Sequence, residues 1–177
     1  MTTIEKMKVI QADITTLEVD AIVNAANTSL LGGGGVDGAI HRAAGPELLE
    51  KTRTLNGVET GQSKITEGYK LPAKYIIHTA GPVFKKGKEG QAALLASCYS
   101  TSLELAKENG LKTIAYPSIS TGVYGYPLEE AVPIAVDTVK EKLEEEGFEG
   151  IEEVIFVCFN EKAFELYQET LDQLKEE

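Results

Sequence analysis

The chain has 177 residues, 42% of them hydrophobic, and a net charge of −11 from 28 acidic and 17 basic residues. This length and composition are typical of one globular domain and exclude a disordered tail, a collagen-like fibre and a coiled coil. No apolar stretch approaches the ~20 residues that cross a bilayer, and the first residues lack the apolar segment of a secretory signal. We therefore expect a cytoplasmic protein with no membrane partner.

The negative charge is concentrated near the C-terminus. Residues 141–177 contain 13 acidic and 3 basic residues, which leaves residues 1–140 close to neutral. Because affinity for nucleic acid requires clustered lysine and arginine, no general nucleic-acid binding is expected. The two cysteines, Cys98 and Cys158, indicate neither a disulfide framework nor a C-x-x-C metal motif. We expect a monomer that needs no metal and no cofactor.

Short runs rich in β-branched residues alternate with helical patterns along the chain. Strands are predicted at residues 8–12, 21–23, 64–68, 75–80, 113–116 and 153–158, and helices at residues 36–44, 46–53, 91–109, 128–146 and 161–174. This alternation predicts an α/β fold with a mixed, mostly parallel central sheet, in a single three-layer α/β/α domain over residues 1–177. The polar strand at 64–68, one short turn before the next strand, indicates at least one antiparallel pairing.

Two of the helices carry further expectations. Pro133 falls inside the fourth helical window, where an interior proline removes a hydrogen bond, so this helix begins either at Leu128 or, after a separate turn, near Pro133. The third helix is expected to bury one stripe of residues, consisting of Ala93, Leu94, Ser97, Cys98, Thr101 and Leu105.

A glycine-rich loop follows the second predicted strand. Residues 32–35 are four consecutive glycines, which supply no packing but let a backbone approach a ligand closely and present its N–H groups. A helix N-terminus, which favours anions, comes directly afterwards. Gly33, Gly35 and Gly38 formally match G-x-G-x-x-G, but eight loop residues separate the glycines from the strand, unlike a dinucleotide fingerprint. A P-loop fits less well, because no Gly-Lys-Ser/Thr follows.

A second loop, residues 118–125, also connects a predicted strand to a helix. Its sequence, Ser-Ile-Ser-Thr-Gly-Val-Tyr-Gly, exposes backbone donors at the C-terminal end of a strand, where ligands of open α/β sheets bind. One such loop alone is explained by an ordinary turn. The two loops together predict a site for two adjoining phosphates, with Tyr124 or Tyr126 as an aromatic wall.

The runs NAAN and GGGGVDGAIHRAAG within residues 24–45, with ISTGVYGYP at residues 119–127, resemble the macrodomain family, specifically its MacroD-type ADP-ribosyl hydrolases. The resemblance extends from about Val9 to Phe159 and departs at Ala12, where this family usually has glycine. It implies a macrodomain that removes the acyl group of O-acetyl-ADP-ribose, or mono-ADP-ribose from aspartate and glutamate side chains of proteins. ADP-ribose, its esters and mono-ADP-ribosylated proteins are thus the implied partners.

The resemblance also implies roles for individual residues. Asp13 would accept a hydrogen bond from the adenine amino group, with the Ile14 backbone nearby, and Phe159 would cover the adenine. Asn27 would hold the distal ribose, and Asp37 would orient or deprotonate the attacking water. The diphosphate would lie between the two loops, at Gly33, Gly34, Gly35, Val36, Ser120, Thr121, Gly122, Val123 and Tyr124, with Tyr124 packed over the distal ribose.

Each of these roles competes with a structural explanation. Asp13 suits a turn cap, loop asparagines often bond their own backbone, and Asp37 in a first helical turn meets the positive end of the helix dipole. His41, four residues after Asp37, is a possible partner in activating water, but structural roles are favoured for His41 and for His78. Two other functions stay open: a module that binds ADP-ribose without turnover, and a nicotinamide-dependent oxidoreductase.

Overall fold

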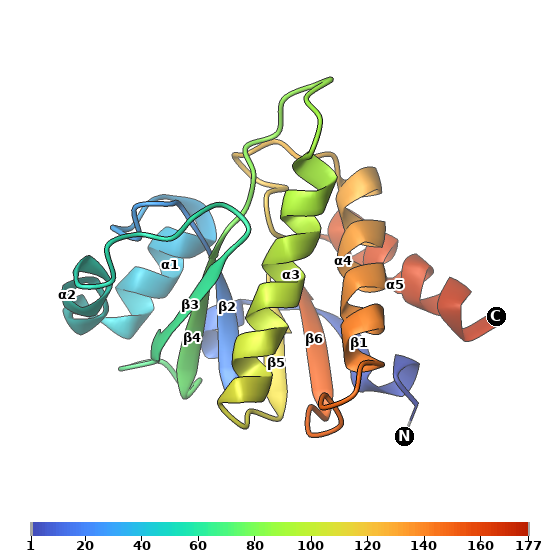
Figure 1. Ribbon diagram of the computed structural model, residues 1–177, viewed down its shortest axis with the longest axis horizontal. Helices are drawn as coiled ribbons and strands as arrows, with labels where there is room; N and C mark the ends of the chain where they lie inside the picture. Colours follow the sequence, from blue (N-terminus) through green and yellow to red (C-terminus); the bar gives the residue numbers. More distant parts are fainter. Residues whose placement is uncertain (1, 177) are drawn as a thin grey trace.

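One six-stranded sheet runs through the protein in the computed structural model, which describes residues 2–176 (Figure 1). Its strands are β1 Met7–Gln11, β2 Ala21–Ala26, β3 Ser63–Glu67, β4 Tyr75–Ala80, β5 Thr113–Tyr116 and β6 Glu153–Cys158. Across the sheet the order is β1-β6-β5-β2-β4-β3, and every neighbouring pair is parallel except β3 with β4. The predicted α/β fold with a mixed, mostly parallel sheet is confirmed, including the antiparallel edge strand.

Helices cover both faces of the sheet. They are α1 Gly35–Ala44, α2 Pro46–Arg53, α3 Gln91–Glu108, α4 Leu128–Leu143 and α5 Glu161–Glu176, with 3-10 turns at η1 Ile4–Lys6 and η2 Ile14–Thr16. One apolar cluster joins the sheet to α3, α4 and α5, and a second joins its other face to α1 and α2. Within residues 2–176, no helix has the length and apolar character that crossing a membrane requires.

Strand β2 shows why the central strands read as continuous apolar runs. Ala21 and Val23 pack into the cluster under α3, α4 and α5, whereas Ile22 packs into the cluster under α1 and α2. Successive side chains of a strand point to opposite faces, and both faces of this sheet are covered, so every position in the run favours an apolar residue.

The structure decides two helix expectations. Of the two starts considered for α4, Leu128 is confirmed and the one near Pro133 is wrong, because Ala131 and Val132 are buried while Pro133 is exposed. The packing outweighs one lost backbone hydrogen bond. In α3 the buried residues are Gln91, Leu95, Cys98, Tyr99, Ser102, Leu103 and Ala106, so the predicted stripe is wrong apart from Cys98. The face that α3 turns to the sheet includes a polar residue, Ser102, whose buried hydroxyl lies 2.6 Å from the Tyr116 hydroxyl.

The sheet topology creates a crevice between β2 and β5. These strands are parallel neighbours, but the helix after β2, α1, lies on one face of the sheet and the helix after β5, α4, lies on the other. The two connections therefore diverge at the carboxyl edge of the sheet, and ligands of open α/β sheets bind at such a point.

Candidate functional site

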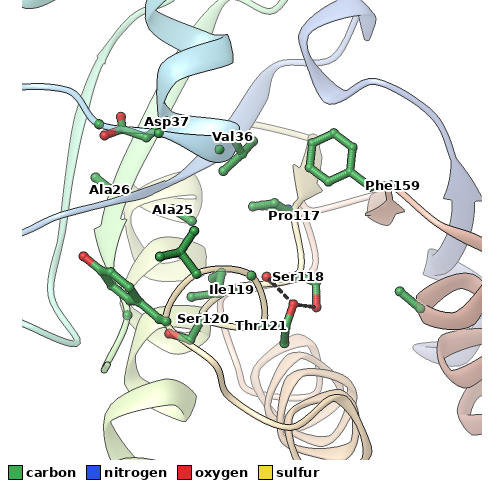
Figure 2. A pocket seen from close by; sticks show the side chains of 18 of the residues that line it. Ala25, Ala26, Val36, Asp37, Pro117, Ser118, Ile119, Ser120, Thr121 and Phe159 are labelled. Carbon is green, nitrogen blue, oxygen red and sulfur yellow. Dashed lines mark hydrogen bonds between the residues drawn. The ribbon is translucent and has the colours of Figure 1, made fainter. Parts of the chain in front are cut away.

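A cavity of about 520 Å³ opens at this divergence (Figure 2). Five segments from different parts of the chain form its walls, and each begins at the end of a strand or the start of a helix. Its lining residues are Ala25, Ala26, Asn27, Gly33, Gly34, Gly35, Val36, Asp37, Gly81, Pro117, Ser118, Ile119, Ser120, Thr121, Gly122, Val123, Tyr124, Leu128, Val157, Phe159, Asn160 and Ala163. The cavity brings together the two glycine-containing loops that the sequence analysis singled out.

The first loop presents the N-terminus of α1 to the cavity. Gly34 is the N-cap and has no side chain to cap the helix, and the first helical hydrogen bond of α1 runs from Gly38 N to Gly34 O. The amides of Gly35, Val36 and Asp37 precede that bond, so they have no partner within the helix. These donors and the helix dipole favour an anion at this wall.

Glycine at position 38 lets the first loop fold back onto α1. A Cβ at Gly38 would lie 2.6 Å from the Gly33 carbonyl oxygen, closer than non-bonded atoms approach. A Cβ at Gly33 would in turn lie 3.1 Å from Asp37 Oδ2 and 3.3 Å from Asn27 Nδ2. The loop backbone is thus in close contact with both polar side chains at this end of the cavity.

The second loop is held by its own hydroxyl groups. Thr121 Oγ1 lies 3.0 Å from the Ser118 carbonyl oxygen and 2.8 Å from Ser118 Oγ, as Figure 2 shows. Ser120 has a left-handed backbone with φ of +65°, and Tyr126 N donates to its carbonyl oxygen at 2.9 Å. A Cβ at Gly81 would overlap Ser120 Oγ and lie 2.7 Å from Ile119 Cγ2, so only glycine after β4 allows this close packing.

Asp37 is a buried carboxylate with one oxygen bound and the other unpartnered. Its Oδ1 accepts a hydrogen bond from Asn24 Nδ2 at 2.8 Å and lies 3.4 Å from His41 Nε2. Its Oδ2 has no hydrogen-bond partner in the described part of the chain, although the residue is only 4% exposed. Because buried polar atoms are normally satisfied, Oδ2 is a candidate contact for a ligand or an attacking water.

A chain of buried polar groups supports Asp37 from behind. Asn24 Nδ2 also lies 3.1 Å from His78 Nδ1, and His78 Nε2 lies 3.0 Å from Thr66 Oγ1. An amide nitrogen only donates, so Nδ1 accepts and the ring proton is on Nε2. Burial, helped by the nearby His41 and opposed by Asp37, lowers the pKa of His78 to about 4. His78 is therefore a neutral core histidine that holds the Asn24 amide toward Asp37.

The Asn27 side chain uses both its amide nitrogen and its amide oxygen to hold the first loop in place. Its Nδ2 donates to the Gly32 carbonyl oxygen at 2.8 Å, and its Oδ1 accepts from Ser29 Oγ and from Leu30 N. These bonds match the structural alternative for a loop asparagine. The side chain nevertheless lines the cavity beside Asp37, so a contact with a ligand stays a prediction.

The structure places two of the predicted site residues outside the cavity wall. Asp13 caps η2, accepting from the Thr15 amide at 3.0 Å and from its hydroxyl at 2.7 Å, and these bonds hold the pKa of the Asp13 carboxyl below its ordinary value. Ile14 is buried in the core under α1 and α2. The other residues to which the resemblance gives a role line the cavity. Of the two tyrosines considered as an aromatic wall, Tyr124 lines the cavity, whereas Tyr126 is buried and does not. Phe159 lies across the cavity from Asp37 (Figure 2) and is 65% exposed.

Two lining residues were absent from the sequence prediction. Gly81 follows β4 directly, and Asn160 follows Phe159 and caps α5 by accepting from Ala163 N at 2.9 Å. Both lie at the carboxyl end of a parallel strand, so extending the strand-end rule to every strand would have found them.

A metal centre is not formed by the residues that the structure describes. Among residues 2–176, no group of three or more histidine, cysteine, aspartate or glutamate side chains is placed to hold a metal ion. The cysteines Cys98 and Cys158 are both buried and unpaired, and burial raises the pKa of each thiol, to about 11 for Cys158. The ionisable side chains among the lining residues are the Asp37 carboxylate and the Tyr124 phenol.

Comparison with known proteins places this site in a family. The protein-family model described as Macro domain matches residues 23–135 of this chain. A macro domain-containing protein of Chlorobaculum tepidum is 64% identical over 162 residues, which cover 92% of this chain and 93% of that protein. The human protein named ADP-ribose glycohydrolase MACROD2 is 54% identical over 170 residues, which cover 96% of this chain but 40% of that protein.

Solved structures agree with this comparison. The Trypanosoma brucei macrodomain in complex with ADP-ribose matches with a TM-score of 0.87 and 46% identity, covering 93% of this chain and 68% of that one. The Oceanobacillus iheyensis macrodomain with ADP matches with a TM-score of 0.88 and 45% identity, covering 96% and 92%. The matched model, the relatives and the shared fold show that this chain belongs to the macrodomain family.

Proposed function

We propose that the protein binds ADP-ribose and hydrolyses esters of its distal ribose, releasing either the acetyl group of O-acetyl-ADP-ribose or mono-ADP-ribose from protein aspartate and glutamate. The observation that carries the proposal is the buried, unpartnered Asp37 Oδ2, which lies beside an anion-favouring helix N-terminus. The names of the compared proteins support the ligand, since one solved macrodomain contains ADP-ribose and MACROD2 is named an ADP-ribose glycohydrolase.

Two walls of backbone amides suit a diphosphate. The first turn of α1 supplies the amides of Gly35, Val36 and Asp37, and the loop over residues 118–125 faces it across the cavity. Ser120 Oγ, buried without a hydrogen-bond partner among the described residues, offers a further hydroxyl donor. Backbone amides and hydroxyls bind phosphate oxygens without the lysines that a P-loop uses.

The two ends of the cavity suit the adenine and the distal ribose of ADP-ribose. Phe159 is 65% exposed at its rim, and a ring with so little packing of its own is well placed to stack on adenine. Asp13 accepts both Thr15 hydrogen bonds on Oδ1, which leaves Oδ2 to accept from the adenine amino group. The opposite end, with Asn27, Asp37 and Tyr124, would then receive the distal ribose.

Asp37 is positioned for general-base catalysis at that end. In the proposed step, Oδ2 accepts a proton from a water molecule as the water attacks the ester. The bond between the acyl carbon and the ribose oxygen breaks, and the proton held on Oδ2 passes to that oxygen. ADP-ribose therefore leaves with a free hydroxyl, the acyl group leaves as a carboxylic acid, and the Asp37 carboxylate is regenerated. The Asn24 amide and His41 hold Oδ1, which directs the free oxygen toward the first loop. The bound diphosphate would help to position the same water.

A binding module without turnover is the alternative. It would share both loops, so the loops do not distinguish the two functions. The buried Asp37 favours hydrolysis, because a module that only binds an anion gains nothing from an unpartnered carboxylate beside the phosphate path.

The deciding experiment measures turnover and binding side by side. Release of ADP-ribose from a glutamate-modified protein and of acetate from O-acetyl-ADP-ribose is compared for the parent, Asp37→Ala and, as a matched control, the exposed acid Asp137→Ala. Asp37→Ala should lower turnover by about 10² to 10⁴ and leave the calorimetric affinity for ADP-ribose within about threefold. No release by the parent above the buffer rate, with binding intact, would leave only the binding module. Full activity of Asp37→Ala would exclude this residue as the base.

A further inference from the structure

The connection between β4 and α3 carries an isolated positive patch at the cavity. Residues 83–90, here named the lysine loop, contain Lys85, Lys86 and Lys88 and a single acid, Glu89, in a chain with a net charge of −11. All three lysines are exposed. None of them forms an ion pair with another residue of the described chain, 2–176.

The lysine loop is attached to the wall of the cavity. Phe84 N donates to the Tyr124 carbonyl oxygen at 2.9 Å, and the rings of Phe84 and Tyr126 lie 5.0 Å apart. Figure 1 shows the loop projecting beyond the carboxyl edge of the sheet, beside the connection from β5 to α4. Because consecutive Cα atoms are about 3.8 Å apart, Lys85 and Lys86 lie within two residue steps of that contact.

The loop is also held in one shape. Gln91, which is 6% exposed, accepts a hydrogen bond from Lys85 N at 2.6 Å and donates to the carbonyl oxygens of Lys85 and Lys88 at 2.8 and 2.9 Å. A buried glutamine thus ties both ends of the lysine run to the start of α3. A surface that is already ordered loses less conformational entropy when a partner binds.

The charge of the cavity rim differs between its two ends. The lysine loop adjoins the end that contains Tyr124. The opposite end adjoins α5, whose first turns expose two acids, Glu161 and Glu165, and one base, Lys162, which lies 3.5 Å from Glu129. A negatively charged polypeptide would therefore be attracted more strongly at the first end. Under the proposed function, the first end holds the distal ribose, which is where the modified protein is attached.

We infer that the lysine loop is a docking surface for acidic polypeptide flanking the ADP-ribosylated residue, so that the protein prefers modified aspartate or glutamate within acidic segments. The inference rests on the proposed function, because the attachment point fixes where the polypeptide leaves the cavity. Complementary charge at an exposed rim contributes mainly to association and selectivity. O-acetyl-ADP-ribose has no polypeptide, so its hydrolysis is independent of the lysine loop.

The test compares two peptides mono-ADP-ribosylated on one glutamate, with either acidic or serine and glutamine flanks, and O-acetyl-ADP-ribose as a third substrate. The variant Lys85→Ser, Lys86→Ser, Lys88→Ser removes the patch, and the same positions changed to arginine keep its charge. A matched control changes Lys51, Lys70 and Lys112 to serine; these exposed residues do not line the cavity.

The parent should favour the acidic peptide over the neutral one by about tenfold in kcat/KM at low salt, and the preference should shrink as salt rises. The serine variant should lose the preference, the arginine variant and the control should keep it, and kcat/KM for O-acetyl-ADP-ribose should change less than twofold. No preference in the parent, or a preference that survives in the serine variant, would overturn the inference. An equal loss of kcat/KM by the serine variant on all three substrates would also overturn the inference, since the lysines would then act on the ADP-ribose group that the substrates share.

Binding separates this inference from the proposed function. If the parent hydrolyses none of the three substrates, the proposed hydrolase fails, and the calorimetric affinities for the two peptides then decide the docking surface. A tenfold preference in Kd that the serine variant loses would support docking even without turnover. Equal affinities for the two peptides, or a preference that the serine variant retains, would overturn it.

Discussion

His78 makes the stability of this fold depend on pH. Burial lowers the pKa of His78 from 6.5 to about 4, so between these values the unfolded chain takes up a proton that the folded protein excludes. Stability rises with pH wherever the unfolded state binds more protons. The contribution of neutral His78 is therefore complete above about pH 6.5 and is lost as the pH falls toward 4.

The size of this effect follows from the interval between the two values. At 1.36 kcal/mol per pKa unit, the drop from 6.5 to about 4 corresponds to about 3 kcal/mol of the free energy of unfolding. Most of it, about 2.5 kcal/mol, is lost by pH 4.5. Carboxylates with lowered pKa, such as Asp13 and Asp20, lose their contributions only at more acidic pH.

Urea unfolding at pH 7.5 and at pH 4.5 measures this contribution. His41 and His78 are the only two histidines, and the test compares the parent with His78→Gln. Between the two pH values the parent should lose about 2.5 kcal/mol more than His78→Gln loses. Equal losses in the parent and in His78→Gln would refute the assignment of a neutral buried imidazole.

Three substitutions at the cavity give further expectations. Gly38→Ala places a Cβ 2.6 Å from the Gly33 carbonyl oxygen, so it should displace the first loop and lower calorimetric affinity for ADP-ribose by about tenfold or more; unchanged affinity would contradict the close contact. Gly35 has φ of +57°, so Gly35→Val should cost about 1–3 kcal/mol of stability through backbone strain. The added side chain would meet no protein atom within 4 Å but would crowd the proposed phosphate path and weaken ADP-ribose binding. Undiminished affinity for ADP-ribose would contradict that path. Phe159→Ala removes a ring that is 65% exposed, so unfolding free energy should change by less than about 0.5 kcal/mol while affinity for ADP-ribose falls about 5- to 100-fold; an unchanged affinity would exclude stacking on adenine.

The order of elements and the position of the cavity could be predicted from the sequence because both depend on local patterns. Alternation of apolar runs and helical windows is sufficient for a layered α/β fold, and strand ends followed by glycine-rich loops indicate where the binding edge lies. The antiparallel strand Ser63–Glu67 was predictable for the same reason, since a short turn joins it to β4.

Features that depend on tertiary contacts could not be predicted in the same way. The buried face of α3 includes Gln91 and Ser102, the latter paired with the Tyr116 hydroxyl, and hydrophobic periodicity gives such polar residues no weight. The start of α4 depends on the burial of Ala131 and Val132, which outweighs the local cost of Pro133. Local propensity is a weak prior wherever packing across the sheet opposes it.

The details of the site also needed the structure. The sequence places Asn24, Asp37 and His78 far apart, and only the fold joins them into one hydrogen-bonded chain. The unpartnered Asp37 Oδ2 is likewise a property of burial and geometry. Asp13 shows the converse, because its capping of η2 follows from a local rule that holds for many aspartates.

The contact between Gly33 and Asp37 constrains how such proteins can diverge. A substitution of Asp37 alone leaves the loop backbone in place, so a related protein that evolves from this one can lose hydrolysis and still bind ADP-ribose. A side chain at position 33 would press on both the carboxylate and Asn27, so a descendant that adapts this loop to a different anion disturbs its own reaction centre at the same step. Under the proposed mechanism, a binding-only module is therefore one substitution away, whereas a hydrolase for a new nucleotide requires several coordinated changes.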